Sequence, residues 1–231
     1  MKALLFPGQG SQVVGMGSDF YKNFSIVKEI FSKADETLKF KISKIIKEGP
    51  DSELKLTQNT QPAILTVSYA IFNVLTKEFN YDLKDIKFFA GHSLGEYSAL
   101  VCSNSLSFED ALYLLHERGK AMQEAVPIGQ GSMLAVLGSD IKEINDLIIK
   151  SKSSEDVCEI ANDNADGQVI VSGTTKTIEK LKENFKAIKK KCILLPVSAP
   201  FHCSLMKKAS EVMSPKINST KFQKPHKEIV T

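Results

Sequence analysis

The pentapeptide Gly91-His92-Ser93-Leu94-Gly95 has the residue types and spacing that place a serine nucleophile in a sharp turn. Glycines at both ends let the backbone tighten until the hydroxyl of Ser93 stands clear of a preceding strand. Such a serine attacks the carbonyl carbon of an ester or thioester and becomes acylated. The alternative is an ordinary glycine turn with a serine that caps the next helix. Of these two roles, we predict that Ser93 is a nucleophile.

A serine nucleophile needs a general base, and histidine is the usual one. The chain contains four histidines: His92, His116, His202 and His226. His92 adjoins the serine and would point the other way, and His116 falls within a predicted helix, where a surface or hydrogen-bonded histidine is usual. His202 lies in the nonrepetitive segment 198–203, and such a loop can present a base over a site. We therefore predict that His202 is the general base for Ser93.

The oxyanion formed during acyl transfer is stabilised by N–H donors, and the sequence offers two candidates in different segments. Gln9 lies in the glycine-flanked loop 7–12 after the first predicted strand, where hydrolytic α/β folds place one donor. The other donor is the amide of Leu94, directly after the nucleophile. A phosphate-binding loop would compete for residues 7–12, but the G-K-[ST] ending is missing.

Arg118 is the single arginine among 30 basic residues. Its helical neighbours three and four residues away are apolar: Leu114, Leu115, Ala121 and Met122. The guanidinium therefore leaves from a core-facing stripe, where a charge needs a partner. One interpretation is bidentate binding of a substrate carboxylate, and the other is an internal salt bridge.

These residues must be positioned by a mixed set of strands and helices. In the first half we expect two strands, a buried one over 2–6 and another over 86–90. We also expect four helices: one over 18–38, one that starts within 59–62 and ends before residue 81, one that starts at 96–101, and one over 107–125. In the second half we expect strands over 133–137, 157–162, 168–172 and 192–197 and helices over 140–150 and 175–188. A helix near 204–213 and a strand from 228 complete the chain. The second half thus has the order βαββαβ of a ferredoxin-like lobe.

Composition excludes several classes of protein. Hydrophobic residues make up 42% and charged residues 25%, as in an average folded soluble domain. The apolar runs are too short for a membrane span, and the N-terminus lacks a signal-peptide pattern. A net charge of +3 and a lysine run at 189–191 without aromatic residues argue against nucleic-acid binding. The four cysteines lack metal-ligand spacing, so we expect no metal, reduced thiols and a cytoplasmic location.

Several segments together carry a resemblance to a known family. They are FPGQGSQ at 6–12, TQPA at 60–63, GHSLGE at 91–96, RG at 118–119, GQVIVSG at 167–173 and the segment 201–206 that begins with Phe201-His202. In this order, over essentially the whole chain, they resemble the malonyl-CoA:acyl-carrier-protein transacylases of fatty-acid synthesis. The resemblance implies an α/β-hydrolase-like large lobe over 1–127, a ferredoxin-like small lobe over 128–198 and a return to the large lobe over 199–231.

The resemblance also implies a role for each site residue. Ser93 would be the acyl nucleophile and His202 its general base and acid. The backbone N–H groups of Gln9 and Leu94 would form the oxyanion hole, and Arg118 would bind the malonyl carboxylate. Malonyl would pass from coenzyme A to the serine, and then to the phosphopantetheine thiol of the carrier protein.

Further expectations follow from the family. Phe201 resembles the bulky residue that accompanies selection of malonyl over methylmalonyl groups. No cofactor is implied beyond the substrates, the partners are malonyl-CoA and acyl carrier protein, and we expect a monomer. Lys207 and Lys208 could meet an acidic carrier protein or could be ordinary solvated lysines. Family members continue beyond residue 231, so we expect the C-terminal part of the fold to be absent.

Two other functions fit part of the pattern. A serine esterase or thioesterase would share Ser93 and His202, with an acidic third residue between them. The candidates for that residue are Asp140, Asp146, Asp163 and Asp166. The second alternative is a truncated, inactive acyltransferase fragment.

Overall fold

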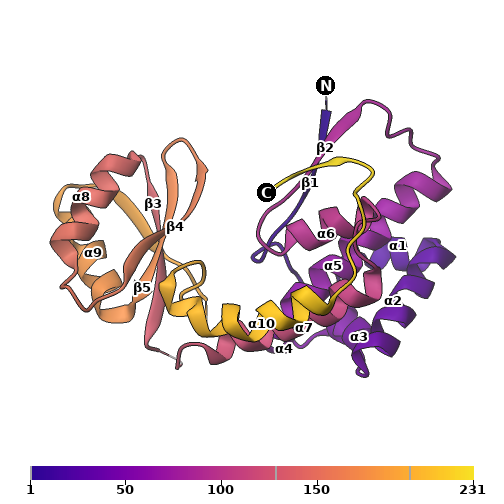
Figure 1. Cartoon of the computed structure of the whole chain (residues 1–231), viewed down its shortest axis with the longest axis horizontal. Coiled ribbons are helices and arrows are strands. Elements are labelled where there is room, and N and C mark those ends of the chain that lie inside the picture. The colour runs from indigo at the N-terminus through magenta and orange to yellow at the C-terminus, as the bar shows by residue number, and fades with distance from the viewer. Residues whose placement is uncertain (1, 128, 198) are drawn as a thin grey trace. The chain divides into compact units, whose positions relative to one another are not determined.

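The computed structural model describes residues 2–127, 129–197 and 199–231. Two compact units make up the chain. Unit 1 contains the residues up to Lys120 together with Met213–Thr231, and unit 2 contains Ala121–Val212. Each unit has its own sheet, as Figure 1 shows. In the described part of the chain, no helix combines the length and the apolar character needed to cross a membrane.

The sheet of unit 1 is parallel, with the order β1-β2-β7. These strands are β1 (Lys2–Phe6), β2 (Ile86–Gly91) and β7 (Glu228–Val230). Parallel strands need long crossover connections, and here helices provide them. The predicted α/β fold with a parallel sheet is confirmed.

The first strand was expected to be buried, and this was wrong. Leu5 is 73% exposed, and Phe6 is the buried residue of β1. The reason is that successive side chains of a strand point to opposite faces: Leu4 and Phe6 face the core, and Leu5 projects from the other face. Phe6 packs edge-on against Phe89, with 5.6 Å between the ring centroids. This contact joins the ends of both strands to the core beneath α6 (Gly95–Cys102).

The remaining helices of unit 1 are α1 (Ser18–Asn23), α2 (Ser25–Leu38), α3 (Ile42–Glu48), α4 (Asp51–Leu54), α5 (Thr57–Asn73), the π-helix Val74–Glu78 and α7 (Phe108–Glu124), which ends in unit 2. The predicted single helix over 18–38 is two helices. They separate at Phe24, which has an extended backbone and packs its ring against Phe79, 5.8 Å away. Helices α3 and α4 were not predicted, although Ile42 and Ile46 are four residues apart and fully buried.

Helix α7 begins where the sequence indicates. The hydroxyl of Ser107 accepts a hydrogen bond from the amide of Asp110 at 3.0 Å. This is the capping pattern that satisfies a free N–H in the first turn of a helix. The cap therefore marks the start of α7.

Unit 2 contains β3 (Gly131–Leu137), α8 (Ile141–Ser151), β4 (Cys158–Ala165), β5 (Gln168–Thr174), α9 (Thr175–Ala187), β6 (Lys191–Leu194), the 3₁₀ helix Ser204–Met206 and the first part of α10 (Lys207–Ser219). The elements follow the expected βαββαβ order, and their strands form an antiparallel sheet in the order β4-β5-β3-β6. Figure 1 shows α8 and α9 together beside this sheet. Their buried side chains form one apolar core with it.

Unit 2 extends beyond the predicted small lobe, since it includes residues 199–212. Three contacts hold this segment there. Pro200 packs on Gly131, Phe201 is hydrogen-bonded to Ser172, and Ser204 to Glu159. The predicted boundaries at 127/128 and 198/199 remain predictions, and residues 128 and 198 lie outside the described part of the chain.

Candidate active site

Ser93 lies in a left-handed turn between β2 and α6 of unit 1, with φ +53°. The turn is held by the strands and by close backbone packing. Phe6 accepts a hydrogen bond from the amide of His92 at 3.1 Å, and the amide of Gly95 donates to the carbonyl of His92 at 2.9 Å. A Cβ on Gly95 would overlap the carbonyl oxygen of Phe6, so only glycine lets the turn approach β1 this closely.

Leu94 is the residue from which α6 begins. Its side chain is buried, and its backbone lies at the N-terminal end of the helix. The free N–H groups and the dipole of a helix make this end favourable for negative charge. The amide directly after Ser93 is therefore in an environment that suits an oxyanion.

Arg118 meets Ser93 within unit 1. Its Nη2 donates to Oγ of Ser93 at 3.1 Å, and its Nη1 donates to Oε1 of Gln61 at 2.7 Å. Gln61 is fully buried in α5. Helix α7 approaches α5 closely here, because Gly119 lies against the backbone of Gln58. The guanidinium is thus fixed from one side by an amide and directed at the serine.

Burial also determines the electrostatics around Arg118. It lowers the pKa of this arginine, while Tyr97 and Glu96 act in the opposite direction. Arginine keeps its charge in proteins despite such shifts. Burial likewise raises the pKa of Tyr97, with the charge of Arg118 opposing it. Among the described residues no ion pair joins Arg118 to an acidic side chain, so its positive charge remains available beside Ser93.

Gln9 lies in the loop after β1, and its side chain is half-buried. Its Nε2 donates to Oγ1 of Thr57, the first residue of α5, at 3.4 Å. Gly8, the preceding residue, packs directly against His92. The Gln9 loop is therefore held between α5 and the turn that carries Ser93.

His116 and His226 each have a local partner in unit 1. Nδ1 of His116 lies 2.9 Å from the carbonyl of Gln58, and its ring packs on Phe40. Nδ1 of His226 lies 3.1 Å from Nδ2 of Asn104. These contacts match the structural role that was expected for His116.

His202 and Phe201 lie in unit 2. His202 is exposed and has a left-handed backbone with φ +58°. The side chain of Phe201 is buried, and its carbonyl accepts a hydrogen bond from Ser172. Ser93 and Arg118 are thus in hydrogen-bond contact within unit 1. His202 and Phe201 belong to unit 2.

Gln61 is the site residue that the sequence reasoning missed. In the sequence it belongs to the TQPA segment at 60–63, which by itself indicates no role. One signal was available, because Gln61 directly precedes the apolar run Pro62–Leu65 of the same helix. Buried polar groups require partners, and Arg118 is the partner here.

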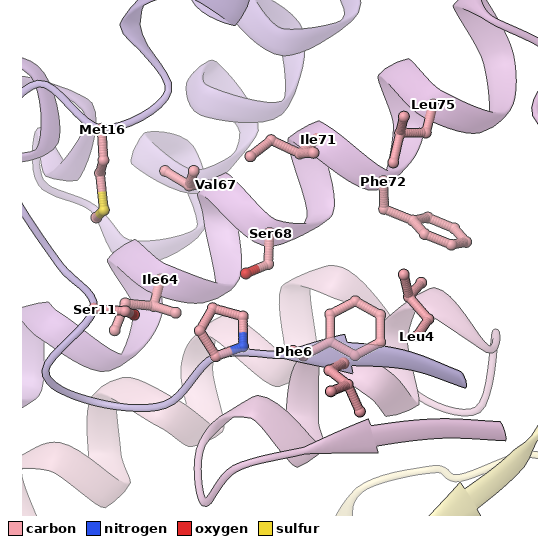
Figure 2. Close-up of a pocket in the computed structure, with 12 residues that line it drawn as sticks. Leu4, Phe6, Ser11, Met16, Ile64, Val67, Ser68, Ile71, Phe72 and Leu75 are labelled. Atoms are coloured by element: carbon pink, nitrogen blue, oxygen red, sulfur yellow. The ribbon is translucent and has the colours of Figure 1, made fainter. Parts of the chain in front are cut away.

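Unit 1 also contains an apolar pocket of about 250 Å³. Figure 2 shows Leu4 and Phe6 of β1 facing Ser68 and Phe72 of α5 across it. Ser93 and Arg118 are not among its lining residues. The pocket is therefore distinct from the polar group of residues around Ser93.

The chain is similar to known acyltransferases. A family model described as an acyl transferase domain matches residues 3–230. The malonyl CoA-acyl carrier protein transacylase of Bacillus subtilis is 46% identical over 210 residues, which is 90% of this chain and 65% of that protein. The chain thus spans just under two thirds of the length of this relative.

Solved structures are similar along the whole chain. The acyl-carrier-protein-S-malonyltransferase of Bartonella henselae has a TM-score of 0.95 and 40% identity, covering 100% of this chain and 74% of that one. A malonyl-transacylase solved in complex with its type II PKS acyl-carrier protein has a TM-score of 0.93 and 37% identity, covering 99% and 73%.

Proposed function

We propose a malonyl transfer reaction for this chain, which belongs to the acyl transferase family. The substrates would be malonyl-CoA and an acyl carrier protein, which the names of the relatives mention. The acceptor on the carrier would be its phosphopantetheine thiol. The observation that carries the proposal is the hydrogen bond from Arg118 to Ser93, because it places one cation beside a serine in a nucleophile turn.

The reaction would proceed in two transfers through an acyl-serine. His202 accepts the proton of the Ser93 hydroxyl as the oxygen attacks the thioester carbonyl. The N–H groups of Gln9 and Leu94 stabilise the oxyanion of the tetrahedral intermediate. The C–S bond then breaks, and coenzyme A leaves as a thiol with the proton from the histidine.

The second transfer repeats these steps in reverse order. The carrier thiol gives its proton to His202 and attacks the malonyl ester on Ser93. The serine oxygen leaves and recovers the proton, and the malonyl group is now a thioester of the carrier protein. Charge and atoms balance without an oxidant, a metal or another cofactor.

Arg118 would select for the malonyl group. A terminal carboxylate that leaves water without a counter-charge costs several kcal/mol. A guanidinium offers two parallel N–H donors to such a planar anion. Gln61 supports this role, because its bond to Nη1 fixes the guanidinium next to Ser93 before substrate arrives. Phe201 would add selection against larger acyl groups.

The proposal includes the architecture and setting that the family implies. The parallel sheet of unit 1 would belong to an α/β-hydrolase-like lobe, and unit 2 would be ferredoxin-like, since its order β4-β5-β3-β6 matches a βαββαβ unit. We place the enzyme in the cytoplasm as a monomer. The exposed Lys207 and Lys208 at the start of α10 are candidate contacts for an acidic carrier protein.

Mass spectrometry of the intact chain tests the proposal. Mixing with malonyl-CoA should add one malonyl mass, and Ser93→Ala should abolish the adduct while Ser68→Ala keeps it. Adding phosphopantetheinylated carrier protein should then move the group to the carrier. Release of free malonate in place of transfer would support a thioesterase, and an adduct that persists in Ser93→Ala would refute the nucleophile.

A further inference from the structure

His202 lies between two residues that are tied to the sheet of unit 2. On one side, the buried hydroxyl of Ser172 donates to the carbonyl of Phe201 at 2.6 Å. On the other side, the carboxylate of Glu159 accepts from the amide of Ser204 at 2.8 Å and from its hydroxyl at 2.6 Å. Residues 29 and 45 positions away in sequence thus fix both flanks of the histidine.

The two anchoring residues are direct neighbours across the sheet. Glu159 of β4 and Ser172 of β5 are paired in the antiparallel register. Directly opposed residues of antiparallel strands project from the same face and lie about 5 Å apart at Cβ. One face of the sheet therefore holds both ends of the segment that carries His202. We name Glu159 and Ser172 the cross-strand clamp.

The backbone of His202 needs such support. Its φ of +58° is in the left-handed region. For a residue with a Cβ this conformation costs roughly 1–2 kcal/mol and persists only where the surroundings impose it. Pro200 packs on Gly131, and the amide of Met206 donates to the carbonyl of Cys203 at 2.9 Å. Together with the cross-strand clamp, these contacts determine the course of the chain on both sides of the histidine.

The clamp contacts differ from ordinary surface hydrogen bonds. Ser172 is fully buried, so losing its hydroxyl would leave the carbonyl of Phe201 without this partner. Glu159 is only half-buried, but each of its oxygens accepts one bond, and bonds to a charged acceptor are the stronger ones. Glu159 and His202 also line the same surface hollow, so the carboxylate is close to the histidine it supports.

We propose that the cross-strand clamp is a positioning device that holds His202 in the orientation required for proton transfer. The inference rests on the proposed function, in which His202 is the base for Ser93. It gives a role to the GQVIVSG segment, whose Ser172 reaches the residue before the histidine. Neither clamp residue touches the reacting atoms in this role.

Kinetics of the full chain test the serine of the clamp. Ser172→Ala should slow acylation of Ser93 by malonyl-CoA about tenfold, or ~1.4 kcal/mol, with KM changed less than about twofold. Ser172→Thr keeps a hydroxyl and should recover most of the rate. The matched control is Ser151→Ala, because Ser151 is also buried in unit 2 and donates to Leu147 at 2.7 Å.

The glutamate of the clamp offers a variant with little risk to folding, because its side chain is near the surface. Glu159→Ala should also reduce the acylation rate about tenfold, and Glu159→Gln, which retains one acceptor oxygen, about threefold. Glu179→Ala, at an exposed position on α9, should leave the rate unchanged.

A second readout follows His202 without using activity. With only four histidines, the ring signals of isotopically labelled histidine can be assigned by NMR through His202→Ala. Clamp variants should shift or broaden the His202 signals, and Ser151→Ala should not. Unchanged signals in Ser172→Ala and Glu159→Ala would overturn the inference, as would equal rate losses in Ser172→Ala and Ser151→Ala.

The same readouts separate the inference from the proposed function. If His202→Ala acylates at the normal rate, or the wild-type chain is not acylated, the proposed function fails. The NMR signals then still decide whether the clamp holds His202. If His202→Ala is slow but the clamp variants acylate normally, the inference fails and the proposed function stands.

Discussion

Ser93 of unit 1 and His202 of unit 2 share an unusual backbone conformation, with φ values of +53° and +58°. The two units hold it in different ways. Around Ser93, the glycines of the motif itself allow the tight turn, since a Cβ on Gly91 would overlap the backbone of Gly95 and Glu96. Around His202, buried and charged side chains from distant strands do so. One conformation can therefore be encoded by a local motif or by long-range contacts, and only the first is visible in a short stretch of sequence.

The largest expected effect comes from the histidine itself. His202→Ala should reduce transfer of malonyl to the carrier by 10²–10⁴-fold, which is the usual contribution of a general base. His226→Ala is the control, since the structure gives His226 a partner in Asn104 of its own unit. Steady-state rates at saturating malonyl-CoA measure the effect. A greater loss in His92→Ala or His116→Ala would identify a different base.

Substitution of a glycine at the serine turn tests the other half of the comparison. Gly95→Ala should lower the free energy of unfolding by ~3 kcal/mol or more, because its Cβ would overlap the carbonyl oxygen of Phe6. Gly10→Ala should cost only ~1 kcal/mol, because its positive φ is strained but no atom lies nearby. Denaturant unfolding measures both. Equal losses would contradict the inference that the contact with Phe6 makes glycine necessary at position 95.

The thiol of Cys203, next to His202, reports whether the segment around the histidine keeps its folded packing. Burial raises the pKa of Cys203 from 9.0 to about 11, so at pH 8 its thiolate should be ~100-fold scarcer than for an unshifted thiol. Its alkylation should therefore be slow at pH 8 and accelerate as the pH rises toward 11. Glu159→Ala should bring the rate closer to that of the unfolded chain. Rapid alkylation of native Cys203 at pH 8, followed by peptide mass spectrometry, would contradict this.

The smallest expected effect is the selection of malonyl over acetyl groups by Arg118 of unit 1. Arg118→Ala should reduce kcat/KM for malonyl-CoA relative to acetyl-CoA at least tenfold, or ~1.4 kcal/mol, because the carboxylate loses its counter-charge. Arg118→Lys should fall in between, since an ammonium cannot reproduce the two parallel donors. A malonyl-to-acetyl ratio that stays within about threefold in both variants would make Arg118 structural.

The sequence predicted most elements of both sheets because apolar spacing and turn residues are local signals. It failed where neighbours decide the outcome. The strand Lys2–Phe6 looks buried in sequence, but only one of its faces meets the core, and Leu5 projects from the other face. The helical spacing over 18–38 continues across Phe24, although an aromatic contact with Phe79 accompanies a break in the helix there. Spacing records which residues are apolar, and it does not record which partner covers them.

The same division holds for the candidate site. The sequence alone determined the serine turn, because Gly91, Ser93 and Gly95 lie within five consecutive residues and the small size of the glycines is the requirement. It also marked Arg118, because one charge on an apolar helix face needs a partner. Only the tertiary structure decided that this partner includes Gln61, and that Glu159 and Ser172 flank the histidine segment. These contacts join residues 29 to 57 positions apart, and they form only after the chain has folded and the strands have found their register.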